Sequence, residues 1–277
     1  MKRVISIALV FALCLSLCAC GKSQAAKECE ELIAAIGEVS IDSKDAIEAA
    51  ERAYSALTAD EKDSISASGA ILNDALDAYY LECCKLIFGT LNDAHEIVSQ
   101  LGDDLYAIGN ATKNNFNFGS EKLNFLKYML SKVSINLTED EMRQGIESTV
   151  EGHNLLNGYD ADLCLFVTHT RSKYGRNELA ELCLKGITNA YKLNGKVTTT
   201  RDTLYAANVM MAEVEGKEAC AKHCVILKNY HDAIEEYLEI CLDIDDAGQI
   251  DQFNTMRESY LGYTATYISD LETLVAQ

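Results

Sequence analysis

Two cysteines and a histidine that could bind a metal ion stand close together at Cys220, His223 and Cys224. On a helix, positions i, i+3 and i+4 share a face, so two thiolates and an imidazole could converge on one ion. His231, two turns further on, could add a ligand. In the alternative interpretation, these residues belong to an apolar seam in which cysteine is a small core residue. The spacing matches neither a standard zinc motif nor the C-x-x-C-H of covalent haem attachment, so we predict no metal and no cofactor.

Two other stretches begin like metal-binding motifs but lack an essential ligand. The stretch from His95 starts like the helix of a zinc protease, yet Ser99 stands where the second histidine is required. The stretch from Asp243 starts like a calcium loop, but Asn254 occupies the twelfth position, which needs a bidentate glutamate. We therefore expect no zinc pair at the first stretch and an acidic break between helices at the second.

Tyrosines near the C-terminus could form a stacking surface for a sugar. Tyr260, Tyr263 and Tyr267 are spaced as on one side of a helix, which favours a place in the core with hydroxyls that reach the surface. The chain has no nucleophile elbow, no phosphate-binding loop and no alternation of strands and helices that would support a nucleotide site. We therefore expect a protein that is not an enzyme.

The composition indicates a helical protein. Its 277 residues include no proline, a residue that breaks helices but is common in loops. Alanine, leucine, glutamate and lysine are abundant. The sequence therefore predicts an all-α fold, with a small N-terminal helical module over residues 29–82 and an antiparallel bundle of long helices over residues 83–277.

Apolar spacing and capping residues predict the individual helices. Thr58 with Glu61, and Thr138 with Glu141, form capping-box patterns that begin helices. The polar stretch 109–119 is expected as a loop. The expected helices are 29–37, 43–57, a short one after Thr58, about 69–106, 120–133, 138 to about 157, 161–173, 179–195, about 198–245, and one from 248 onwards. The helix over 198–245 would carry a coiled-coil-like seam formed by Cys220, Cys224, Leu227, His231, Ile234, Leu238 and Cys241.

Charge and cysteine content limit the partners and the redox state. The chain has 24 basic and 43 acidic residues, a net charge of −19. Such a surface repels phosphate backbones, so we expect no nucleic acid as partner. Most of the cysteines beyond the first twenty residues fall in apolar stripes, which favours buried thiols, with disulfides as the alternative. These cysteines are Cys29, Cys83, Cys84, Cys164, Cys183, Cys220, Cys224 and Cys241.

The first twenty residues have the features of an export signal. A positively charged start precedes an uncharged run over 4–17, which is short for a membrane span and has the length of a signal-peptide core. Leu-Cys-Ala-Cys follows at 17–20 and resembles a bacterial lipobox. The resemblance implies a lipoprotein signal peptide over 1–19 and diacylglycerol on Cys20. The alternative is an ordinary signal peptide in which Cys20 is one more apolar residue.

A second resemblance covers the predicted N-terminal module. Residues 20–28 make a tether without a Gly/Ser-rich or Pro-rich stretch, and the part before the first helical pattern reaches roughly 20 Å when extended. The module after it resembles short helical units of bacterial cell-surface proteins. The matching residues are Ile33, Ile36, Gly37, Val39, Ser43, Ile47, Ala50, Tyr54, Leu57, Thr58, Glu61, Lys62, Ile65, Leu72, Ala75 and Tyr79. The resemblance implies a spacer or interaction unit and brings no catalytic residues with it.

Together these features predict a protein held by diacylglycerol on Cys20 at the outer face of the cell membrane. Its expected role is non-enzymatic, as a scaffold or in contact with envelope proteins. The alternative is a lipoprotein that binds a small ligand, a metal or haem between its helices, around Cys220, His223 and Cys224. A filled helical seam would favour the scaffold, whereas a cavity with convergent polar groups would favour the ligand-binding protein.

Overall fold

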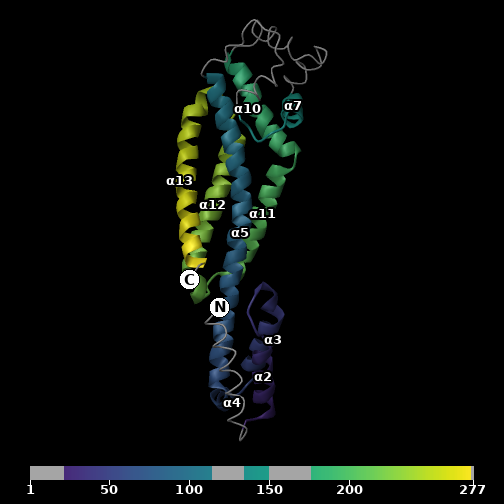
Figure 1. Cartoon of the computed structure of the whole chain (residues 1–277), viewed down its shortest axis with the longest axis vertical. Coiled ribbons are helices and arrows are strands. Elements are labelled where there is room, and N and C mark those ends of the chain that lie inside the picture. Colours follow the sequence, from purple (N-terminus) through teal and green to yellow (C-terminus); the bar gives the residue numbers. More distant parts are fainter. Residues whose placement is uncertain (1–21, 114–133, 150–175, 276–277) are drawn as a thin grey trace. The chain divides into compact units, whose positions relative to one another are not determined.

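The computed structural model describes residues 22–113, 134–149 and 176–275, and every regular element in these ranges is a helix (Figure 1). The all-α prediction is confirmed. None of the helices in the described ranges is both long enough and apolar enough to cross a membrane. The expected signal peptide over 1–19, the lipid-attachment residue Cys20, and the helices expected at 120–133 and 161–173 lie outside the described residues.

The packing of the chain defines two compact units. The first contains the described residues up to Leu86 together with Val214–Lys222, and the second contains Ile87–Glu213 and His223–Gln277. The long helix α5 (Ser66–Lys113) contributes its first turns to one unit and the rest to the other.

The first unit is built from short helices that pack beside the start of α5. They are α2 (Gln24–Ala35), the 3-10 turn η1 (Ile41–Ser43), α3 (Lys44–Ser55) and α4 (Ala59–Ser64). Apolar positions three or four residues apart face inward, and the buried residues include Ala26, Cys29, Ile33, Ile47, Ala50, Leu57, Ile65 and Leu72. The Lys217 ammonium lies 4.6 Å from the centroid of the Tyr80 ring, which attaches the 214–222 segment to α5.

Helix α2 begins earlier than the apolar pattern predicts. The expected start is residue 29, but the Ser23 hydroxyl caps the helix by accepting a hydrogen bond from the Ala26 backbone N–H at 3.1 Å. The Ser23 hydroxyl also donates to Glu61 at 2.6 Å, and the Lys22 ammonium pairs with Glu30 at 2.7 Å. The tether expected over 20–28 is therefore helical from Gln24 onwards.

The second unit is a bundle of long helices. Beside α5 it contains α7 (Glu139–Glu147), α10 (Arg176–Leu193), α11 (Lys196–Val214), α12 (Ala221–Asp243), η3 (Ala247–Gln249) and α13 (Ile250–Val275). A short connection after Asp243 reverses the chain, so α12 and α13 run antiparallel along α5 (Figure 1). The expected seam on α12 is buried from Leu227 to Cys241, whereas Cys224 is only half-buried.

One long helix expected over 198–245 is in fact two. Helix α11 ends at Val214, and Gly216 has a φ of +78°, a left-handed conformation that glycine adopts with little penalty. The Lys217 backbone N–H donates to the Val214 carbonyl at 3.2 Å and closes the turn. After the 3-10 turn η2 (Glu218–Cys220), α12 starts again.

The prediction of a loop over 109–119 is wrong for residues 109–113. Helix α5 continues through Gly109 to Lys113, and the remainder of the expected loop lies outside the described residues. A Cβ atom at Gly109 would collide with the Ile250 side chain at the start of α13. Glycine therefore stands here because two helices approach closely, and not because the chain turns.

Helix α7 begins as predicted but ends about ten residues earlier than the expected position near 157. Its capping box is confirmed, since the Thr138 hydroxyl accepts from the Glu141 N–H at 3.2 Å and the Glu141 carboxylate accepts from the Thr138 N–H at 2.8 Å. At the other end, the Ser148 and Thr149 hydroxyls each donate to a carbonyl three residues back, at 2.7 Å. These bonds replace helical hydrogen bonds and end the helix.

Candidate functional site

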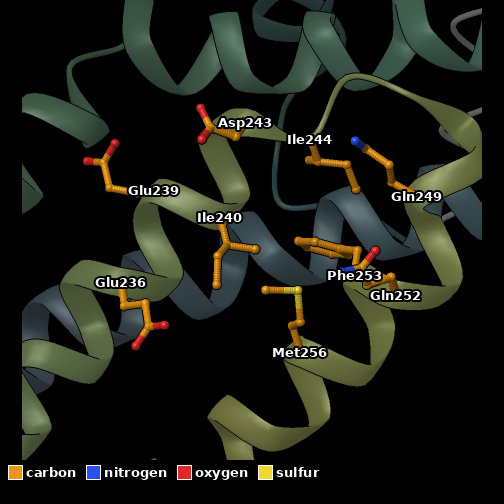
Figure 2. Close-up of a pocket in the computed structure, with 9 residues that line it drawn as sticks. All are labelled: Glu236, Glu239, Ile240, Asp243, Ile244, Gln249, Gln252, Phe253 and Met256. Atoms are coloured by element: carbon orange, nitrogen blue, oxygen red, sulfur yellow. The ribbon is translucent and has the colours of Figure 1, made fainter.

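A surface groove of about 360 Å³ lies where α12 ends and α13 begins. All of its lining residues belong to the second unit: Glu236, Glu239, Ile240, Asp243, Ile244, Gln249, Gln252, Phe253 and Met256. Figure 2 shows the carboxylates along one side, the glutamine amides along the other, and the apolar side chains between them. The groove is therefore polar at both edges and apolar along its floor.

The floor of the groove contains two buried core residues and two side chains with accessible apolar atoms. Ile244 and Phe253 are 4% and 3% exposed, so they belong to the core of the bundle. Ile240 and Met256 are half-buried and leave apolar surface open to the groove. A ligand that covered these two side chains would gain free energy from the apolar area it removed from water.

The acidic edge follows one face of α12. Glu236, Glu239 and Asp243 are separated by three and four residues, so they lie about one helical turn apart, and all three are exposed. Glu239 accepts a hydrogen bond from the Arg201 guanidinium on α11 at 2.7 Å. Neither Glu236 nor Asp243 forms an ion pair with another residue in the described ranges. This edge therefore favours a cationic ligand.

Local hydrogen bonds set the turn that closes the groove. Helix α12 stops at Asp243, and the Asp246 carboxylate accepts from the Gly248 N–H at 2.7 Å. The Gln249 N–H donates to the Asp246 carbonyl at 3.0 Å, so the chain turns before α13 begins at Ile250. The acidic break expected at the calcium-like stretch is confirmed.

Among the described residues, Cys220, His223 and Cys224 are not a group whose ligand atoms come together around one point. The structure places Cys220 in the first unit, and His223 and Cys224 in the second. His223 is buried, and burial lowers the pKa of its imidazole. The seven cysteines that the structure describes carry thiols, and six of them are buried. Cys164 lies outside the described residues.

Within the described residues, one other group could hold a metal ion. The ligand atoms of His231, Asp232 and Glu235 lie within 4.8 Å of one another, and His231 Nδ1 is 3.1 Å from the Asp232 carboxylate. His231 is buried in the bundle, whereas the two acidic residues are exposed. All three donors come from one helix, and no second helix supplies a ligand to this group. The sequence pattern indicates His231 as a seam residue and as an added ligand for the cysteines, and it does not predict this group.

His95, from the zinc-protease-like stretch, belongs to an aromatic cluster inside the bundle. Its Nδ1 atom lies 2.6 Å from the Tyr260 hydroxyl on α13, and its Nε2 atom lies 3.4 Å from the Ser99 hydroxyl. Its ring centroid is 5.7 Å from that of Tyr230 on α12. Because Ser99 lies inside α5, the backbone N–H groups beside it are engaged in the helix and do not stabilise an oxyanion. The cluster joins three helices.

The C-terminal tyrosines divide into three environments. Tyr260 is buried and stacks on Tyr237, with centroids 4.1 Å apart and an interplanar angle of 18°. Its hydroxyl contacts His95 and does not reach the surface. Tyr267 is half-buried, whereas Tyr263 is 62% exposed, so its expected place in the core is wrong. Tyr237, which the predicted seam omits, is part of the core.

A buried aspartate is the other polar centre of the second unit. Asp104 on α5 is fully buried and accepts hydrogen bonds from the Asn136 N–H at 2.7 Å and the Asn136 amide at 2.9 Å. Its other oxygen accepts from the Tyr191 hydroxyl on α10 at 2.9 Å. Burial raises the pKa of Asp104 even though these hydrogen bonds and nearby Lys196 oppose the rise. In the sequence, Asp104 follows Leu101 by three residues and precedes Ile108 by four, a spacing that puts it on the same helix face as these core residues.

Comparison with family models, with curated proteins and with solved structures finds no significant match for this chain.

Proposed function

We propose that this protein is anchored by diacylglycerol on Cys20 at the outer face of the cell membrane and binds another protein of the cell envelope, without catalysis. The anchor is supported by the lipobox-like residues 17–20 at the end of a signal-peptide pattern. The interaction role is supported by the groove between α12 and α13, which combines an accessible apolar floor with a charged edge.

The positions of the buried titratable groups also favour a binding role. His95 and Asp104 have pKa values shifted by burial, which is common for catalytic groups. Both are occupied in contacts between helices, and neither lines the groove. The carboxylates that do line it come from one helix face and are exposed, as in a surface that recognises a partner.

The anchor is tested by Cys20→Ala in the full chain, expressed in a bacterium with a lipoprotein-processing pathway. We expect the wild-type protein in the membrane fraction and the variant either released or unprocessed, because no thioether to diacylglycerol can form. Cys18→Ala is the matched control, since a lipobox has a small residue at that position, and it should stay in the membrane. Normal processing and membrane association of Cys20→Ala would refute the anchor.

The interaction is tested by photo-crosslinking on intact cells. A crosslinker placed at Met256, in the groove, should give a discrete adduct with an envelope protein that mass spectrometry can identify. A crosslinker at Tyr263, exposed elsewhere on α13, is the control and should not give that adduct. The same adducts from both positions, or none from Met256, would contradict a partner at the groove.

A further inference from the structure

The groove has two parallel stripes of different chemistry. Glu239 and Asp243 on α12 are each followed by an isoleucine, Ile240 within the helix and Ile244 just after its end, so an acidic stripe runs beside an apolar one. Met256 on α13 faces the apolar stripe across the groove (Figure 2). From Glu236 to Asp243 the acidic stripe is about 10 Å long, or two helical turns.

The acidic stripe selects the sign of the occupant's charge. Arg201 already bonds Glu239 at 2.7 Å, which shows that this edge accepts a guanidinium. Glu236 and Asp243 have no ion-pair partner among the described residues, and a basic occupant would supply one. A second copy of this chain, with a net charge of −19, is a poor occupant because like charges repel.

The apolar stripe excludes occupants that are only charged. A polyamine or a metal ion at the acidic edge would leave the open surfaces of Ile240 and Met256 in water. A helix with apolar side chains on one stripe and lysine or arginine on the adjacent stripe would match both the apolar and the acidic stripe of the groove. Its side chains repeat about once per helical turn, as the acidic side chains of α12 do.

We propose that the groove binds a basic amphipathic helix of a partner protein, with apolar side chains on Ile240 and Met256 and basic side chains on Glu236, Glu239 and Asp243. This proposal rests on the interaction role proposed above and names the chemistry of the partner.

The test uses the lipidated full chain in nanodiscs of neutral phosphatidylcholine, with empty nanodiscs as the reference. The probe is a fluorescent synthetic peptide of leucine and lysine, about five helical turns long, with leucine at i, i+3, i+4 and i+7. A second peptide has the same lysines but serine in place of leucine. Binding is measured by fluorescence anisotropy at low and at high salt.

The leucine–lysine peptide should bind, and its affinity should fall at high salt. Combining Glu236→Gln, Glu239→Gln and Asp243→Asn should weaken binding about tenfold, because the edge then loses the negative charge of three exposed carboxylates that attracts the lysines. Met256→Gln should weaken it several-fold without a change in charge. The charge-matched control combines Asp202→Asn, Asp270→Asn and Glu272→Gln at exposed positions outside the groove, and should bind within about twofold of wild type.

Circular dichroism and the melting temperature of each variant show that a loss of binding does not come from unfolding. Equal weakening by both triple variants, equal binding of the serine–lysine peptide, or no binding at all would overturn the proposal. So would a monomer–dimer equilibrium that shifts with Met256→Gln, which would assign the groove to a second copy. If the Cys20→Ala experiment shows that the chain is not lipidated, the titration is run without nanodiscs and its outcome still decides the partner class.

Discussion

Asp103 and Asp104 are neighbours on α5, but their surroundings differ sharply. Asp103 has a half-exposed side chain and pairs with Arg257, whereas Asp104 is fully buried and accepts three hydrogen bonds. The Asp104 carboxylate thereby holds Asn136, in the segment before α7, and Tyr191 on α10. A buried carboxylate of this kind organises the packing of the helices that meet it.

We predict that Asp104→Ala lowers the free energy of unfolding by about 3 kcal/mol, because it leaves the buried Tyr191 hydroxyl and the part-buried donors of Asn136 without their acceptor. Asp103→Ala is the matched control and should lower it by at most about 1 kcal/mol, since the ion pair it removes is exposed to solvent. Urea unfolding of the full chain, followed by circular dichroism, measures both values. Similar losses for the two variants would contradict the role assigned to Asp104.

The pKa of His95 provides a pH-dependent prediction. Burial lowers this pKa from its ordinary value of 6.5, because the imidazolium is disfavoured among Tyr230, Tyr260 and Ser99. As the pH falls below about 6.5, the unfolded chain therefore binds more protons at this residue than the folded chain does. The contribution of His95 to stability is present above pH 6.5 and is lost as the pH falls through the pKa of the folded state.

We therefore expect the free energy of unfolding at about pH 5, relative to that at about pH 7, to be lower in wild type than in His95→Gln, which does not titrate. His223, whose pKa burial also lowers, should leave part of the slope in place. Urea unfolding at several pH values measures the two slopes. The expectation fails if wild type and His95→Gln have the same slope.

Two glycines of helix α5 differ in how closely neighbouring residues approach them. A Cβ atom at Gly102 would collide with the ring and hydroxyl of Tyr237 on α12, whereas a Cβ atom at Gly89 would meet no atom within 4 Å. Both glycines are helical and lie in the second unit. The same substitution at the two positions should therefore have opposite effects.

We predict that Gly102→Ala lowers the free energy of unfolding by about 2 kcal/mol, because Tyr237 must move out of a packed position. Gly89→Ala should raise it by up to about 1 kcal/mol, because alanine has the higher helix propensity and finds open space there. Thermal and urea unfolding of both variants provide the comparison. A stabilising Gly102→Ala would show that α5 and α12 do not approach closely at this position.

The helix boundaries show which structural features a local sequence pattern can predict. The capping boxes at Thr58 and Thr138 are made of residues three apart, so their hydrogen bonds were predictable. The local sequence did not show which glycines end a helix. Gly109 lies within a helix and packs against Ile250, whereas Gly216 ends a helix. Whether a glycine ends a helix or allows close packing depends on a neighbouring helix, and the residues next to the glycine in the sequence do not reveal that neighbour.

For the whole molecule, the composition indicates the fold class and gives the net charge, but it does not show where the charged residues lie on the surface. The absence of proline and the helical apolar spacing predict an all-α protein, and the described residues confirm it. The net charge of −19 leads us to expect no polyanionic partner, yet it does not say where acidic residues border apolar ones. That border arises at the groove because α12 and α13 pair antiparallel after the turn at Asp246.

The helical class, the helix starts at the Thr58 and Thr138 capping boxes and the acidic break at Asp243 could be derived from the chain alone, because each depends on residues within one or two turns. The His95–Tyr260 contact joins residues 165 positions apart, and the Tyr191–Asp104 contact joins residues 87 apart. Such pairs, and the groove between α12 and α13, depend on how helices dock side by side. Many helix pairings satisfy the same amphipathic pattern, so the choice among them emerges only when the whole bundle packs.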